Sequence, residues 1–301
     1  MKMKIYAFRA EQRGPRSLEA VLQRINALPL MERSFLGQNA LRLETARQAD
    51  GLWFADFAAP RHGHGPGRMG PNSPIEGIDL AEGLMFGEDT GIAYDPRSRY
   101  LAVQYNHYGP RVSSIQDYLF GADLSFGELG ERAEGQSDED RCGFRIGAVL
   151  KPDAYARLRR WGIYKSIEMS ISVPGALAAD LGAGRSLGSV LRSPLPGGVE
   201  TITLGLTARP GRDGVLGEDG VRAIINDIER LGLAVKHAVV KGKPTVEDKL
   251  DAVNLVNDRI SADPSINLGH GLRYVRQDRW DVLGRTLSQW LQEGRLPRAA
   301  E

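Results

Sequence analysis

The sequence predicts an α+β fold with mixed, largely antiparallel sheets and packed helices. Short segments of alternating or continuous apolar character, typical of strands, recur along the whole chain. Several of them are separated only by turn residues, as the strands of antiparallel hairpins are. Helical segments are scattered among the strands, and no segment repeats at the periods of solenoid proteins.

The composition is that of a globular protein without a charge excess. The chain has 301 residues, of which 42% are hydrophobic and 26% charged, enough for one large domain or two of ordinary size. Lysine and arginine total 39 against 38 aspartates and glutamates, so the net charge is +1 and a charged partner must meet a local patch. The single cysteine, Cys142, excludes an intrachain disulfide and a cysteine-only zinc site.

Location is predicted from the same composition. A lone cysteine suits a reducing compartment. The first ten residues lack the apolar run of a signal peptide, and no apolar run approaches the roughly 20 residues that span a bilayer. We therefore expect a cytoplasmic protein that does not insert into a membrane.

The first half of the chain shows clear strand, helix and turn signals. The segment Leu18–Leu28 has its apolar residues at helical spacing, and Ser17 suits the N-cap. The turn residues Ala49-Asp50-Gly51 predict a hairpin, and Gly109-Pro110 ends a strand before a helix over 112–119. The expected strands cover residues 4–8, 41–45, 52–57, 84–94 and 100–105.

Two segments favour irregular structure. Pro60–Pro74 holds four prolines and four glycines, which predicts a long surface loop. Residues 121–141 are polar, glycine-bearing and acidic, and we interpret them as a linker or insertion. This predicts an N-terminal domain over 1–135 and a C-terminal domain over 136–301.

The second half predicts further strands and helices. A helix is expected directly after Lys151, where Pro152 suits the first turn, and Leu250–Ile260 fits either a helix or a strand. The other expected helices cover residues 187–191, 221–231 and 280–291. The expected strands cover residues 144–150, 166–173, 200–208, 234–240 and 272–275.

The sequence holds no catalytic signature. His62 and His64 lack the further ligands that a metal needs, so solvated loop histidines explain them better. The glycines over 63–68 lack the ending of a phosphate-binding loop. Cys142 follows an acidic run, which raises a thiol pKa, and we expect it to be inert. We predict no catalytic residue, no metal site and no cofactor.

Basic residues gather in two stretches, which are the candidate DNA-binding regions. In the first, Arg157 and Arg160 share a helical face, and Trp161 and Tyr164 are of the type that stacks on bases. The second follows a predicted strand, and lysines at such places contact phosphates without reading the base sequence. The candidate residues are Arg157, Arg159, Arg160 and Lys165 in the first stretch, Lys236, Lys241 and Lys243 in the second, and Arg68 in the glycine-proline loop.

Other interpretations remain open. A solvated helix face and a lysine-protected edge strand explain the same residues without DNA. A metal-dependent nuclease would use Glu247 and Lys249 with a further acid, although Glu247-Asp248-Lys249 is more typical of a solvated turn. A third alternative is a structural or protein-interaction module without nucleic-acid binding.

The order of N-terminal elements carries a family resemblance. An opening strand containing Tyr6 precedes the Leu18–Leu28 helix, a hairpin and a broken loop, and a later strand turns at Gly109-Pro110 into a helix with Asp117-Tyr118-Leu119. This order resembles the RexA proteins of lambdoid phage-exclusion systems over about the first 120 residues. The alternating strand SIEMSISVPG also resembles a RexA segment that precedes a basic helix, whereas residues 176–181 here are small and not basic.

The chain is similar, more weakly, to the Kiwa defence component KwaB. These resemblances imply a homo-oligomeric, two-domain sensor of anti-phage defence that recognises DNA or phage-associated complexes and activates a membrane effector. They imply no enzymatic activity. We therefore expect a non-enzymatic, largely sequence-independent binder of double-stranded DNA that forms a homo-oligomer and acts with a membrane-protein effector.

Overall fold

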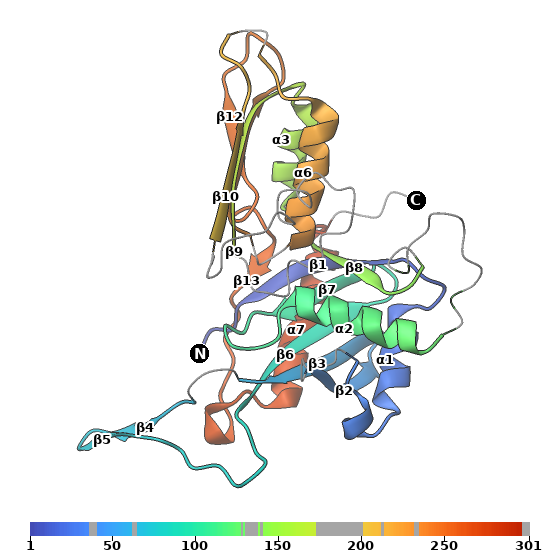
Figure 1. Ribbon diagram of the computed structural model, residues 1–301, viewed down its shortest axis with the longest axis vertical. Coiled ribbons are helices and arrows are strands. Elements are labelled where there is room, and N and C mark those ends of the chain that lie inside the picture. Colours follow the sequence, from blue (N-terminus) through green and yellow to red (C-terminus); the bar gives the residue numbers. More distant parts are fainter. Residues whose placement is uncertain are drawn as a thin grey trace.

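The computed structural model describes residues 1–35, 41–61, 65–127, 129, 138, 141–172, 201–211, 214–231 and 235–296. The predicted α+β fold is confirmed, because helices pack on antiparallel sheets (Figure 1). Among the described residues, no helix is long and apolar enough to cross a membrane.

The first sheet has seven strands in the order β13-β1-β7-β6-β3-β2, and β8 also pairs with β1. All of these pairings are antiparallel. The strands are β1 (Ile5–Gln12), β2 (Arg42–Ala49), β3 (Leu52–Pro60), β6 (Gly87–Asp95), β7 (Tyr100–Gln104), β8 (Phe144–Ala148) and β13 (Ser261–Ala262).

Helices cover both faces of this sheet. Successive strand residues point to opposite faces, so Phe8 packs with the core under α1 (Leu18–Asn26) and α2 (Val112–Ser125). Its neighbour Ala7 packs with the core under α7 (Arg276–Gln292). The sheet is therefore the middle of three layers.

The second sheet has the order β10-β9-β11-β12. Its strands are β9 (Ile163–Ser172), β10 (Thr201–Thr207), β11 (Val235–Lys243) and β12 (Asp251–Asn254), and its helices are α3 (Pro152–Arg160) and α6 (Glu218–Leu231). The alternating residues Ile167, Met169 and Ile171 of β9 share one core with apolar residues of both helices. Figure 1 shows both helices on the same face of this sheet.

The structure describes smaller elements outside the two main sheets. The hairpin of β4 (Arg68–Gly70) and β5 (Ser73–Glu76) lies inside the segment predicted to be a loop, and its strands pair with each other. Two 3-10 helices cover Leu30–Glu32 and His270–Leu272.

Several predicted elements are confirmed, while others differ. Ser17 caps α1, and the β2–β3 turn places Asp50 and Gly51 at φ 52° and 78°, as a two-residue hairpin turn requires. The strand predicted at 272–275 is wrong, because Gly271 and Leu272 adopt left-handed backbone at φ 68° and 58° and form a 3-10 turn. The ambiguous segment 250–260 contains the strand β12, whereas the predicted helix over 187–191 lies outside the described residues.

The predicted domain boundary at 135/136 differs from the division between the sheets. β8 pairs with β1 from Phe8↔Ala148 to Gln12↔Phe144, and β13 pairs with the other end of β1. α7 buries Trp280 and Leu283 on the first sheet. The described members of the second core all lie between Leu150 and Val256, so the second sheet is built from a stretch inserted between β8 and β13.

Candidate nucleic-acid interface

Pairing between β9 and β11 brings the two predicted basic stretches together. The strands are antiparallel, with Lys241 opposite Ser166 and Lys243 opposite Ile163. The start of β9 follows α3 directly, so Arg159 and Arg160 end their helix beside the same strand ends. We call Arg159, Arg160, Lys165, Lys241 and Lys243 the basic end of the second sheet. This end lies away from the first sheet (Figure 1).

A close backbone approach fixes this geometry. A β-carbon on Gly242 would lie 2.5 Å from the Trp161 ring and 2.8 Å from the Ile163 carbonyl oxygen. Real β-carbons do not approach other atoms so closely, so a glycine is required there. A register shift between Lys241 and Gly242 accompanies the contact. The Trp161 indole therefore packs the residues after α3 against the last residues of β11.

Three residues of the basic end are exposed cations. Arg159, Arg160 and Lys241 are exposed, and within the described part of the chain no acidic side chain forms an ion pair with them. Arginine and lysine in such a setting are available to phosphate oxygens.

The other two members of the basic end, Lys165 and Lys243, donate hydrogen bonds to carbonyl oxygens of neighbouring loops. Lys165 Nζ donates to the carbonyl oxygens of Gly211, at 3.2 Å, and Gly214. Lys243 Nζ donates to the carbonyl oxygen of Val246. A carbonyl group carries no net charge, so the ammonium group of Lys243 still contributes positive potential to this end.

Arg157 does not belong to the basic end, contrary to the prediction. Its guanidinium lies 3.4 Å from Asp251 Oδ1 and 3.4 Å from Asp258 Oδ2, and it donates to the carbonyl oxygen of Ala252 at 3.2 Å. These contacts attach α3 to β12 and the segment after it. Two carboxylates therefore offset the charge of Arg157.

Arg68 and Lys236 also lie apart. Arg68 lies on the exposed β4–β5 hairpin, where its Nη2 is 2.9 Å from Glu76 Oε2. Lys236 lies near the beginning of β11, whereas Lys241 and Lys243 lie near its end, and the side chain of Lys236 is outside the described residues. Of the eight predicted residues, the five of the basic end therefore lie together.

The predicted stacking of Trp161 and Tyr164 on bases is wrong. Their exposed fractions are 3% and 1%, and both belong to the core of the second sheet. Tyr164 Oη donates to the Leu158 carbonyl oxygen at 3.0 Å, which satisfies its hydroxyl inside the core. Any contact with nucleic acid at this end is therefore made by charged side chains.

Glu247-Asp248-Lys249, the candidate nuclease segment, lies in a turn that follows β11. Asp248 Oδ2 accepts hydrogen bonds from the backbone N–H of Thr245, at 2.9 Å, and from Thr245 Oγ1, at 2.8 Å. This arrangement is typical of turns closed by aspartate. Within the described residues no group of three or more His, Cys, Asp or Glu side chains is placed to hold a metal ion. His62 and His64 lie outside those residues.

Cys142 is buried, and its predicted inertness agrees with its surroundings. Burial raises the pKa of its thiol to about 11, and the neighbouring Asp123 and Asp138 carboxylates contribute in the same direction. A thiol with such a pKa is almost fully protonated at neutral pH and is a poor nucleophile.

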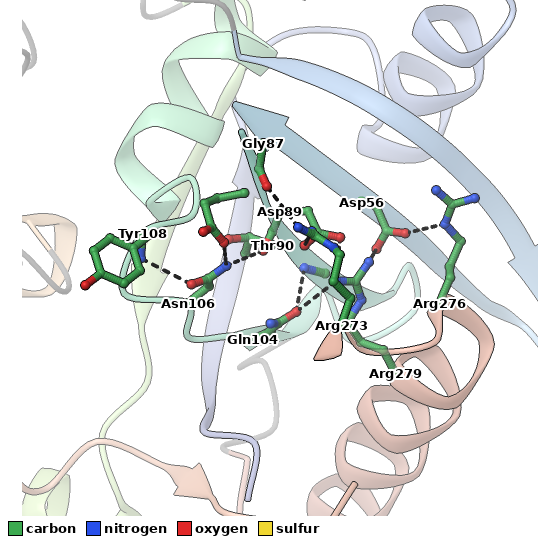
Figure 2. A network of polar contacts seen from close by, with 12 residues as sticks. Asp56, Gly87, Asp89, Thr90, Gln104, Asn106, Tyr108, Arg273, Arg276 and Arg279 are labelled. Carbon is green, nitrogen blue, oxygen red and sulfur yellow. Dashed lines mark hydrogen bonds and ion pairs between the residues drawn. The ribbon is translucent and has the colours of Figure 1, made fainter. Parts of the chain in front are cut away.

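Sequence reasoning missed a buried network of charges between α7 and the first sheet (Figure 2). Arg279 Nη2 lies 2.8 Å from Asp56 Oδ1, and its Nη1 lies 2.7 Å from Asp89 Oδ2. Asp56 also accepts from Trp280 Nε1 at 3.0 Å and from Arg276 Nε at 2.8 Å. Asp56 therefore links β3 to three residues of the first turns of α7.

Both carboxylates of the network, those of Asp56 and Asp89, have arginine partners. Burial raises the pKa of Asp56 above its ordinary value, while Arg279, Trp280 and Arg276 act in the opposite direction. Arg273 Nη1 donates to the Gly87 carbonyl oxygen at 2.9 Å and also pairs with Asp89. Since both carboxylates are held by arginines, the arrangement fixes the position of α7. A lone acid within the apolar strand LWFADFAA was the one signal that pointed to it.

No protein-family model matches the chain, and no curated protein matches it in sequence.

Proposed function

We propose that this chain is a non-enzymatic, largely sequence-independent DNA-binding sensor of an anti-phage defence or phage-exclusion system. The observation that carries the proposal is the pairing of β9 with β11, which places cations from two distant stretches at one end of one sheet. The exposed cations Arg159, Arg160 and Lys241, which form no ion pair among the described residues, suit the phosphate backbone of duplex DNA.

The basic end supports backbone contact rather than base reading. The exposed cations Arg159, Arg160 and Lys241 come from a helix end and a strand end, and the nearby aromatic rings are buried. Phosphate contacts of this kind hold DNA without sequence preference. The proposed setting, in which a cytoplasmic protein acts with a membrane-protein effector, rests on the resemblance of the first 120 residues to RexA proteins.

A mobility shift tests DNA binding and enzymatic activity together. The full chain is mixed with random-sequence duplex DNA and magnesium at low and at physiological salt, and the DNA is then recovered and sized. Retention of intact DNA that weakens as salt rises supports the proposal, because phosphate contacts are salt-dependent. Absence of retention at low salt contradicts it. DNA that is shortened by the wild type but stays intact with Glu247→Ala favours the nuclease alternative instead.

A further inference from the structure

An arm projects from the end of the first sheet. We give this name to residues 65–86, which leave the sheet after β3 and return to it at β6. Figure 1 shows the β4–β5 hairpin of the arm extending away from both sheets. β4 and β5 form a two-stranded sheet of their own. An isolated hairpin of two strands is at best marginally stable in water.

The arm exposes many large apolar side chains. Ile75 and Leu84 are 72% and 63% exposed. The exposed apolar residues of the arm are Met69, Ile75, Ile78, Leu80, Leu84 and Met85. Monomeric proteins rarely expose contiguous apolar patches larger than a few hundred Å². This concentration on one short segment indicates a surface that another protein covers.

A second apolar group lies beside the foot of the arm. Leu268, Leu272 and Val275 are exposed in the turn that precedes α7. Arg273 joins this turn to the strand that follows the arm, because it donates to the Gly87 carbonyl oxygen and pairs with Asp89. Both apolar groups therefore meet at the same end of the molecule.

The charge of the arm favours a protein with a basic surface. Within residues 65–86, Arg68 stands against Glu76, Asp79 and Glu82, a net charge of 1 − 3 = −2. The rest of the chain therefore carries +1 − (−2) = +3. An acidic arm is repelled by DNA and by anionic lipid.

The start of α7 offers the complementary surface. Arg273 and Arg276 keep 53% and 54% of their side-chain surface exposed despite their ion pairs, and Arg47 and Arg285 of α7 are also exposed. Asp278 and Asp281 of α7 are exposed as well, so these exposed side chains carry a net charge of 4 − 2 = +2. Arg47 lies over the Trp280 ring of α7 and bonds Gln277, which places it on the same face. One copy of this chain thus carries both an acidic apolar arm and a basic apolar turn.

We infer that the arm is a dimerisation element that packs on the turn at 268–276 and the start of α7 of a second copy. In a twofold dimer each surface meets its counterpart reciprocally. Because arm and turn adjoin in each copy, one axis at this end buries both pairs of surfaces. The arm and the basic end lie at opposite ends of the molecule (Figure 1), so the dimer presents two basic ends.

Light scattering coupled to size-exclusion chromatography tests the inference without DNA. The full chain is run over about a hundredfold range of protein concentration, since dimers dissociate on dilution. The wild type has the mass of a dimer. The double variant Ile75→Asp/Leu84→Asp raises the dissociation constant at least about tenfold, because it places charges in the apolar contact. A wild-type monomer at every concentration overturns the inference.

A matched control separates the arm from apolar exposure in general. Met31 is 94% exposed on the 3-10 helix at Leu30–Glu32, and Met31→Asp keeps the wild-type mass. A variant with a short glycine-serine loop in place of residues 66–85 is expected to be monomeric and to keep a far-UV circular dichroism spectrum close to that of the wild type. If this variant still forms the wild-type dimer, the inference is wrong. Dimerisation without DNA binding would contradict only the proposed function.

Discussion

Arg279 and Asp56 form a buried ion pair between α7 and β3, with 2.8 Å between Nη2 and Oδ1. Their side chains are 3% and 1% exposed. The pair joins the last helix to an early strand, beside the stacked rings of Phe54 and Trp280. The packing of α7 on the first sheet therefore forms only when residues from distant parts of the sequence have come together.

The buried pair predicts unequal effects for two neighbouring arginines. Arg279→Met removes the buried cation that pairs with the buried Asp56 carboxylate, so we expect the free energy of unfolding to fall by about 3–5 kcal/mol. Arg276→Met removes a cation that is more than half exposed, and the loss should be about 0–1 kcal/mol. Chemical denaturation measures both values. Equal losses for the two variants would contradict the prediction that the buried Arg279–Asp56 pair contributes more stability than the exposed Arg276–Asp56 pair.

Gly242 is predicted to be required by the basic end. The added methyl group of Gly242→Ala meets the Trp161 ring and the Ile163 carbonyl oxygen, and overpacking of this kind costs about 1–3 kcal/mol. Gly205→Ala in β10 is the control, because a β-carbon there has nothing within 4 Å and should cause no loss. Thermal and urea unfolding compare the two variants. Wild-type stability in Gly242→Ala would contradict the close contact.

Cys142 is predicted to react slowly in the folded protein. Burial is the largest cause that raises its thiol pKa to about 11, so the folded state favours the protonated form. The stability that this buried neutral thiol contributes is present below the pKa of the unfolded thiol and is lost as pH rises through about 11.

Alkylation by a maleimide or iodoacetamide measures this prediction. Native protein should react far more slowly than denatured protein at neutral pH, and the native rate should keep rising toward pH 11. A native rate that levels off near pH 8.5, the ordinary thiol pKa, would contradict it.

Local signals in the sequence predicted local structure well. Asp50-Gly51 specifies a hairpin turn through its own backbone preferences, and Ser17 caps α1 through a hydrogen bond to a residue three positions away. Both depend on a few neighbouring residues. The strand predicted at 272–275 was wrong because Gly271 and Leu272 adopt left-handed backbone at its start, and Leu272 has no intrinsic preference for that conformation.

Contacts between residues far apart in the chain could not be predicted from the sequence. Arg157 resembles its neighbours Arg159 and Arg160, yet Asp251 and Asp258 hold it. Its partners lie about a hundred residues away in the chain. Likewise the linker-like segment before Phe144 suggested a domain boundary, whereas β8 returns to the first sheet. Burial of Trp161 also depends on Gly242, which the pattern around the indole does not reveal.

The salt dependence of DNA affinity tests the central claim most directly. Fluorescence anisotropy with a labelled random duplex compares the wild type with Arg159→Ala/Arg160→Ala/Lys241→Ala. The control Lys2→Ala/Arg97→Ala removes two exposed cations outside the basic end, one before β1 and one in the turn between β6 and β7. We expect the triple variant to bind more weakly and its slope of log affinity against log salt to fall by about 3 in magnitude, one for each lost phosphate contact. The control should keep the wild-type slope. A folded triple variant with wild-type affinity and slope would contradict the assignment of DNA binding to the basic end.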